Sequence, residues 1–121
     1  MNDIQINLRL EERLALMDLQ GDVTALAEKK MVAAYERAAA QKARLLILNF
    51  SAVNYINSAG MAIIITLLNK TQAQGGALRA FGLTLHFQKI FEMVGLLKYI
   101  PHFNSENEAR TGRSKETTEP A

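Results

Sequence analysis

The chain has 121 residues, of which 49% are hydrophobic and 21% are charged, and its formal net charge at pH 7 is +2; this length supports one domain around one core. It contains no cysteine, which excludes disulfide bonds, thiolate catalysis and cysteine-based metal sites and fits a reducing compartment. It shows neither a secretory signal nor an apolar run near the ~20 residues of a membrane span, so we expect a cytoplasmic protein with no membrane insertion.

The first elements are predicted to be two strands joined by a tight turn. Residues 4–10 alternate apolar and polar side chains, which is the pattern of a half-buried strand. A second apolar segment, 14–19, ends at Gly21. Glu11 and Glu12 lie between the two segments and are expected to form the hairpin turn.

A helix and a central strand are predicted next. Apolar residues recur at helical spacing over residues 24–41, and Asp22 or Thr24 can cap the start of this helix. Residues 45–50 form a continuous apolar run, which indicates a strand covered on both faces. We expect a polar loop over residues 51–57.

The most apolar helical segment covers residues 59–74 and stops at a Gly-Gly pair. A short strand is expected over residues 77–81. Apolar residues at i, i+3, i+4 and i+7 spacing predict a third helix over residues 87–94. Residues 99–103 can form a last edge strand, because Pro101 lacks the N–H that a central strand needs.

The domain organisation follows from this order and from a change in composition at Asn104. Residues 104–121 contain no large apolar side chain, so they cannot bury enough surface to offset their ordering entropy. We therefore predict a domain over residues 1–103 and a polar, disordered tail over residues 104–121. Alternating strands and helices indicate an α/β fold, with a mixed sheet of four to five strands and three to four helices.

Catalytic and metal-binding patterns are missing from the sequence. His86 and His102 are isolated, which favours surface or rim positions over metal ligation. The Gly75–Gly76 pair follows a helix and lacks the lysine of a phosphate-binding loop, so it is interpreted as a helix stop. We expect no enzyme activity, no cofactor and no metal. The basic residues are dispersed, so no direct nucleic acid binding is expected either.

The junction before the apolar helix is the candidate functional position. A serine directly before a helix, as Ser58 is, is most simply an N-cap that accepts a hydrogen bond from a backbone N–H. The same position follows the end of a central strand, where ligand and partner sites of α/β folds collect. It also lies at a helix N-terminus, which tolerates a phosphate dianion. On these grounds both interpretations stay open.

The helix that follows this junction is apolar on more than one side. Met61, Ile64, Ile65 and Leu68 form a stripe that suits contact with the sheet. At 100° per residue, Ile63 falls almost opposite that stripe. Such a helix is either fully buried or carries a binding surface, and the small size of the domain favours partner contact at Ile63.

Residues 45–82 read LLILNFSAVNYINSAGMAIIITLLNKTQAQGGALRAFG. An apolar strand ending in asparagine is followed by a short loop, the motif Asn57-Ser58-Ala59-Gly60, an apolar helix and a Gly-Gly turn. This segment resembles the centre of STAS domains, the bacterial anti-sigma-factor antagonists, and residues 90–100 (IFEMVGLLKYI) are similar to the third helix of that family. The resemblance covers residues 4–103 in order and spacing.

The resemblance implies a non-enzymatic, phosphorylation-controlled switch. In such proteins a serine at the position of Ser58 is phosphorylated by a partner kinase, commonly the anti-sigma factor itself, and a Ser/Thr phosphatase removes the phosphate. The unmodified form binds the anti-sigma factor and frees the sigma factor, which regulates transcription. This chain departs from the family at Asn57 and Thr24, where aspartate is usual, and at Ala59, where a second serine is usual.

The partner surface is expected to combine the start of the apolar helix with the loop before the first helix. It comprises Asp22, Thr24, Asn57, Ser58, Ala59, Gly60, Ala62, Ile63 and Thr66. Two other functions stay open. One is a constitutive scaffold or subunit, in a stress-sensing assembly or a lipid-transport complex, in which Ser58 is only a helix cap. The other is a nucleotide-binding or hydrolysing domain, which the missing phosphate loop and metal ligands disfavour.

Overall fold

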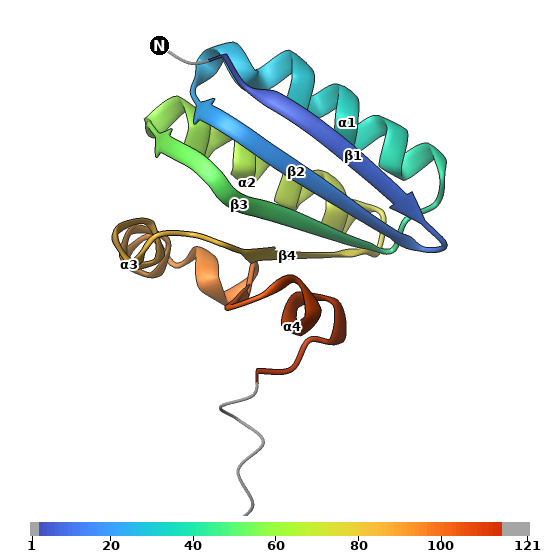
Figure 1. Cartoon of the computed structure of the whole chain (residues 1–121). Helices are drawn as coiled ribbons and strands as arrows, with labels where there is room; N and C mark the ends of the chain where they lie inside the picture. Colours follow the sequence, from blue (N-terminus) through green and yellow to red (C-terminus); the bar gives the residue numbers. More distant parts are fainter. Residues whose placement is uncertain (1–2, 115–121) are drawn as a thin grey trace, which may run out of the picture.

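A computed structural model describes residues 3–114 and shows a five-stranded sheet with helices on both faces (Figure 1). In chain order the elements are β1 (Gln5–Glu11), β2 (Leu14–Val23), the 3₁₀ helix η1 (Ala25–Ala27), α1 (Glu28–Ala40), β3 (Leu45–Ile56), α2 (Ser58–Ala73), β4 (Ala77–Phe81), α3 (Leu85–Met93), the 3₁₀ helix η2 (Leu96–Lys98), β5 (His102–Phe103) and α4 (Glu106–Thr111). The predicted α/β fold with a mixed sheet is confirmed.

The sheet has the strand order β1-β2-β3-β4-β5. β1 and β2 form an antiparallel hairpin, and every other neighbouring pair is parallel. Because β2, β3 and β4 run in one direction, their carboxyl ends meet at one edge of the sheet, which lies on the left of Figure 1. That edge is where partner and ligand sites of open α/β sheets usually form.

β3 is twice as long as the apolar run predicted, and the expected polar loop over residues 51–57 is wrong. The strand continues to Ile56 because its second half pairs with the end of β2, with Val53 opposite Gly21 and Ile56 opposite Val23. Val53 and Ile56 are buried, while the residues between them are exposed. Opposite Gln20 and Asp22 of β2 the register shifts, and at each shift β3 contains one extra residue.

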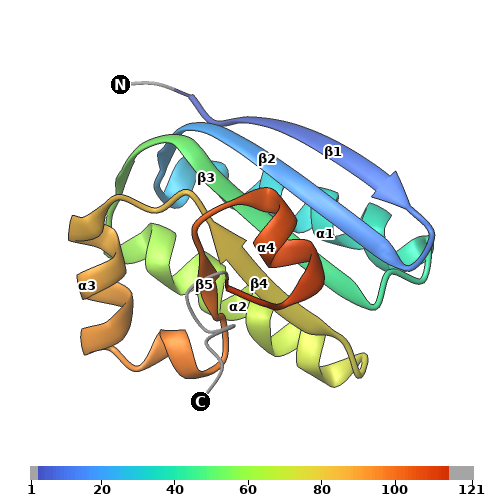
Figure 2. The ribbon, with the colours of Figure 1, turned by 60° about the horizontal axis from the view of Figure 1, so that its bottom comes forward.

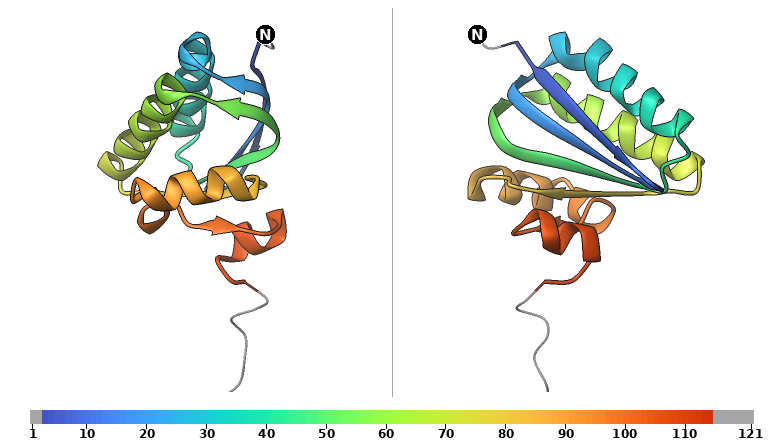
Figure 3. Two further views of the ribbon diagram at one scale, coloured as in Figure 1. Left: turned by 90° about the vertical axis from the view of Figure 1, so that its left-hand side faces the viewer. Right: turned by 45° about the vertical axis from the view of Figure 1, so that its right-hand side comes forward.

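Two helices cover one face of the sheet. α1 and α2 lie side by side on it (Figure 3), and both contact strands and each other. The main core lies between them and the sheet, and its fully buried side chains include Met17, Met31, Leu48, Phe50, Ile64 and Leu67. α3 adds to this core through Phe91, whose ring packs edge-on against Phe50 with centroids 6.0 Å apart.

The other face of the sheet is covered in part by α4 (Figure 2), so the expected disordered tail from Asn104 is wrong for residues 104–114. Ala109 of α4 is fully buried against Leu16, Ile47 and Phe81. The helix also has a cap, because the Ser105 hydroxyl accepts a hydrogen bond from the Glu108 N–H at 3.1 Å. Residues 115–121 of the predicted tail lie outside the described residues.

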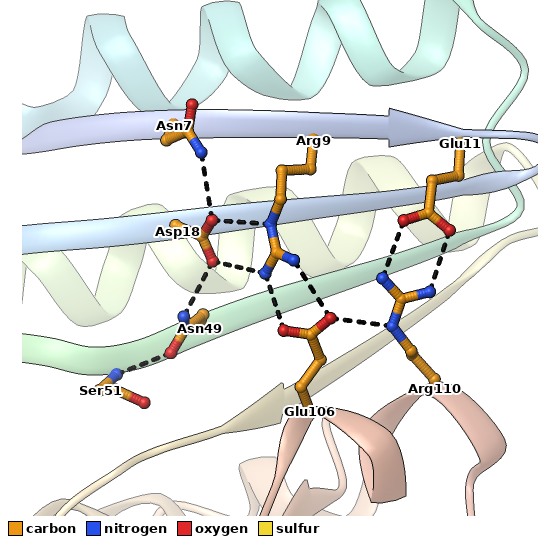
Figure 4. Close-up of polar contacts among 8 residues, drawn as sticks. All are labelled: Asn7, Arg9, Glu11, Asp18, Asn49, Ser51, Glu106 and Arg110. Atoms are coloured by element: carbon orange, nitrogen blue, oxygen red, sulfur yellow. Dashed lines mark hydrogen bonds and ion pairs between the residues drawn. The ribbon is translucent and has the colours of Figure 1, made fainter.

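An ionic network attaches α4 to the hairpin (Figure 4). Arg9 on β1 donates to both Asp18 on β2 and Glu106 on α4, at 2.8–3.1 Å. Arg110 donates to Glu106 and makes two bonds to Glu11, at 2.8–2.9 Å. Arg79 of β4 also donates to the Ala109 and Arg110 carbonyls, at 2.8 and 3.2 Å. These polar contacts and the buried Ala109 explain why a sequence without large apolar side chains is ordered here.

The network changes the acidity of its carboxyl groups. Hydrogen bonds from Arg9 hold the pKa of Glu106 below its ordinary value. Partial burial alone would raise the pKa of Asp18, but hydrogen bonds from Arg9 and Asn49 outweigh this effect and lower it. Both carboxyl groups are therefore ionised in the folded protein at neutral pH. Within residues 3–114 no helix combines the length and the apolar character needed to cross a membrane.

Candidate partner-binding surface

The start of α2 is fixed against the end of β2 by backbone contacts and by a side-chain cap. The Asn57 N–H donates to the Val23 carbonyl at 3.2 Å. The Asn57 side-chain oxygen in turn accepts a hydrogen bond from the Gly60 N–H at 2.9 Å, which makes Asn57 the N-cap of the helix. The aspartate usual at this position in the resembled family would offer the same kind of oxygen, so asparagine preserves the cap without the charge.

Ser58 is not the N-cap, as its position before the apolar helix suggested, but the first residue of α2. Asn57 performs the capping role because it is the last residue with extended backbone before the helix, which places its side chain beside the Gly60 N–H. Ser58 is exposed, and its hydroxyl makes no hydrogen bond with any residue in the described range 3–114. The capping explanation for this serine is therefore removed, and its hydroxyl is accessible from solvent.

Gly60 allows the close approach of α2 to β2. A Cβ atom built on this residue would overlap the carbonyl oxygen of Val23, a backbone atom that cannot move aside cheaply. Glycine is required here for space, since the residue lies in an ordinary helical turn. The motif around Ser58 thus combines a cap at Asn57 with a steric requirement at Gly60, and together they set where Ser58 lies.

The predicted exposure of Ile63 is wrong. Its side chain is 5% exposed, because α2 packs against α1 and η1 as well as against the sheet. Ile65, which was expected to face the sheet, is 39% exposed instead. With 100° per residue, Ser58, Ala62, Ile65 and Thr66 fall on the outward side of the helix. The exposed apolar residue on the Ser58 side of α2 is therefore Ile65.

The loop before α1 lies at the same edge of the sheet. The Thr24 hydroxyl oxygen accepts a hydrogen bond from the Leu26 N–H at 3.3 Å, so Thr24 caps η1 as the sequence predicted for the start of this helical region. Asp22 is partly buried in β2, beside Tyr55 of β3. η1 contacts α2, which brings this loop next to the helix that begins with Ser58.

Three exposed apolar residues at this edge were missed by the sequence analysis. Leu26 follows β2, Tyr55 lies near the end of β3 and Leu85 begins α3 after β4; they are 69%, 51% and 83% exposed. Because the three strands end at one edge, these residues lie at the same edge of the sheet as the start of α2. Single apolar residues in loops carry no periodic signal, and only the parallel topology reveals that they belong to one surface.

The two histidines each have a structural contact. His102 Nε2 accepts a hydrogen bond from the Leu83 N–H at 3.0 Å, and burial lowers the pKa of His102, which keeps the ring neutral and able to accept. His86 packs its ring against Phe87. No three His, Cys, Asp or Glu residues of the described part of the chain come together as a metal site.

Known proteins share this fold. The sequence model of the STAS domain matches residues 5–109. An anti-sigma factor antagonist from Mycobacterium paratuberculosis has 17% identical residues and a TM-score of 0.77, with 90% of this chain and 92% of that chain covered. The phosphorylated form of the Bacillus cell fate determinant SpoIIAA has 20% identity and a TM-score of 0.69, with 90% and 97% covered.

A transport-related protein is similar as well. A sulfate transporter family protein from Wolinella succinogenes has 12% identity and a TM-score of 0.73, with 86% of this chain and 87% of that chain covered. No curated protein sequence is similar enough to this chain to count as a match. At these identities the solved structures establish the fold, and the surface around Ser58 has to be interpreted from its own residues.

Proposed function

Because the chain belongs to the STAS domain family, we propose that it is a phosphorylation-controlled protein-binding switch of the anti-sigma factor antagonist type. The surface around unmodified Ser58 binds an anti-sigma factor or a related Ser/Thr kinase in the bacterial cytoplasm. Phosphorylation of Ser58 by that partner ends the binding, and a Ser/Thr phosphatase restores it. The protein regulates transcription by binding and carries out no chemistry itself.

The observation that carries this proposal is the exposed, unbonded hydroxyl of Ser58 at the first turn of α2. Asn57 accepts the hydrogen bond from the Gly60 N–H, so the helix cap does not depend on the Ser58 hydroxyl. Exposed apolar side chains at Ile65, Leu26 and Tyr55 lie on the same helix or at the same sheet edge. An accessible hydroxyl beside apolar contact area suits a site that is both bound and modified by one protein.

The charge of a phosphate acts on the interface and leaves the fold intact. A phosphoserine carries about −1.5 to −2 charges at pH 7. The first turn of α2 contains no acidic residue, and its N–H groups form the positive end of the helix dipole, which favours a nearby anion. A partner that covers Ile65 and its neighbours has to desolvate this anion, which opposes binding.

Mass spectrometry of the protein isolated from its own cells tests this proposal. A population carrying one phosphate on Ser58, which disappears when the gene for the bound kinase is deleted, is the expected result. Wild-type protein that is unmodified at Ser58 under every growth condition, yet still holds its partner, contradicts the switch.

A second function is favoured by one comparison. The similarity to a sulfate transporter family protein shows that this fold also occurs in transport-related proteins. In that case the chain is a constitutive subunit, and the Ser58 surface is a permanent interface. Asn57, which lacks the charge usual before the phosphorylated serine, fits this alternative. Unchanged partner binding by Ser58→Asp would favour it over the switch.

A further inference from the structure

A cleft of about 700 Å³ lies at the end of the molecule opposite Ser58. It forms where the β1–β2 hairpin, the end of α1 and the end of α2 meet, on the right of Figure 1. Ser58 starts α2, whereas Thr71 and Gln74 at the other end of the helix line the cleft, so a helix of roughly 24 Å separates the two places. The volume is in the range of small-molecule sites.

The floor of the cleft is apolar in character. Tyr35, Ala38, Leu46 and Thr71 are buried there, and Leu10 and two further alanines extend the lining. The polar groups on the floor are already satisfied. The Tyr35 hydroxyl donates to the Lys70 carbonyl at 3.0 Å, and the Thr71 hydroxyl donates to the Leu67 carbonyl at 2.7 Å. These two hydroxyls are therefore engaged within the protein, and the buried side chains beside them, Ala38 and Leu46, are apolar.

The rim of the cleft is cationic. Arg13, Lys42 and Arg44 line it, and none of the three forms an ion pair with any residue between 3 and 114. Arg44 makes one long contact, 3.5 Å, to the Gly75 carbonyl. Of the two acidic residues at the rim, Glu11 is engaged by Arg110. The cleft therefore presents more uncommitted positive charge than negative charge.

The backbone gives an independent indication. Arg13 and Lys42 have φ angles of 63° and 61°, in the left-handed region that glycine occupies most readily. At its other positive-φ positions within the described range the chain uses glycine. Two cationic residues thus occupy backbone conformations that favour glycine, and both line the same cleft. Such local conflicts between conformation and residue type cluster at functional sites.

We propose that this cleft binds a small, soluble amphipathic anion, with its apolar body on the floor and its acidic head group held by Arg13, Lys42 and Arg44. The apolar floor supplies contact area and the unpaired cations supply charge recognition. This site is separate from the Ser58 surface and does not depend on the function proposed for that surface.

Octanoate is a suitable probe, because it combines a carboxylate with a short apolar chain. In a two-dimensional NMR titration of the full chain, we expect saturable shifts of the amide signals of Arg13, Lys42, Arg44 and Gly76. Octanol, which lacks the charge, and inorganic phosphate, which lacks the apolar chain, should each bind at least tenfold more weakly. Binding to vesicles that contain phosphatidylglycerol is measured as well, to distinguish recognition of a soluble ligand from recognition of a lipid surface.

Two variants test the cations and the floor separately. Arg13→Gly with Lys42→Gly removes two charges at positions where glycine suits the backbone, so the fold is retained while octanoate affinity falls at least tenfold. Ala39→Phe keeps the charges and fills the cleft, and should also block octanoate. A matched control, Lys89→Gln with Lys98→Gln, removes the same charge from exposed positions on α3 and η2 and should leave binding unchanged.

Several results would overturn the proposal. They are the absence of saturable shifts with octanoate, equal binding of inorganic phosphate, and equal loss of binding in the control variant. If the protein binds vesicles through these cations but does not bind octanoate, the cations recognise a lipid surface. That result would also overturn the proposal of a soluble ligand.

Discussion

The residues around Ser58 have different physical roles, which the sequence motif alone does not distinguish. Asn57 provides a hydrogen bond, Gly60 provides space, and Ser58 provides a free hydroxyl. The first two hold the start of α2 against Val23 at the end of β2, and the third is left for interaction.

Replacing Gly60 by alanine tests the steric requirement. The added methyl group would overlap the Val23 carbonyl oxygen, so the start of α2 must shift, and we expect a loss of roughly 2–3 kcal/mol in the free energy of unfolding. Gly95→Ala is the matched control, since no atom lies within 4 Å of its Cβ position and only its left-handed backbone opposes alanine, at about 1 kcal/mol. Urea unfolding measures both values, and equal losses would remove the special role of Gly60.

Ile63 and Ile65 of α2 together test which face of the helix binds a partner. Ile63→Asp places a carboxylate in the core and should destabilise the domain by several kcal/mol, on the order of 3–5. Ile65→Asp changes a partly exposed position, so the fold should persist while partner binding weakens at least tenfold. Thermal unfolding combined with pull-down separates the two effects. Normal partner binding by folded Ile65→Asp would exclude this helix face.

At the scale of elements, α4 is the part of the structure that the sequence predicted least well. Its docking on the sheet uses ion pairs between residues about a hundred positions apart, such as Arg110 with Glu11, hydrogen bonds from Arg79 to its backbone, and a buried alanine. Neither feature has a periodic signature. The strands and the other helices were predictable, because their apolar periodicity records burial directly.

The candidate site was predictable in sequence position but not in geometry. The motif located Ser58 and Gly60. It did not reveal that Ile65 is exposed and Ile63 is buried, because this depends on how α1 and η1 pack against α2. When a helix is covered on two sides, helical spacing alone does not predict which of its residues are exposed. The extension of β3 was missed for a related reason, since strand pairing with β2 overrides its local polarity.

Deleting residues 105–121 measures the contribution of α4. The deletion uncovers Leu16, Ile47 and Phe81 and breaks the ionic network, so we expect a loss of roughly 3 kcal/mol in the free energy of unfolding. Deleting residues 115–121 is the control, because it leaves every contact described above in place. A change below about 1 kcal/mol for the longer deletion would show that α4 adds little to the domain.

The network also predicts how stability depends on pH. Glu106 and Asp18 have lowered pKa values in the folded state, so the unfolded chain binds their protons first as the pH falls. Their stabilisation is present above pH ~5 and is lost as the pH falls below about 4. Glu106→Gln should lose about 1 kcal/mol at pH 7, since the pair is about one-third exposed. Urea unfolding curves of the two proteins should converge toward pH 3, and parallel curves would contradict this account.

At the scale of the whole molecule, α2 joins the two ends of the domain for which we propose functions. The carboxyl edge of the sheet carries Ser58 and the exposed apolar residues, and the opposite end carries the cationic cleft. Between them lie the sheet, its covering helices and the main core. Modification at Ser58 is therefore expected to change what the surface binds without changing the fold beneath it.

The affinity of the proposed kinase partner for three forms of this protein tests that claim most directly: unmodified, phosphorylated at Ser58, and Ser58→Ala. A desolvation penalty of about 3–4 kcal/mol corresponds to a loss of a few hundredfold. We expect that loss on phosphorylation, with the thermal midpoint unchanged or raised, and near-normal affinity for Ser58→Ala. Gln72→Glu, which adds charge to an exposed position at the far end of α2, should bind normally. Equal affinities for the phosphorylated and unmodified forms, or unfolding of the phosphorylated form, would contradict the account.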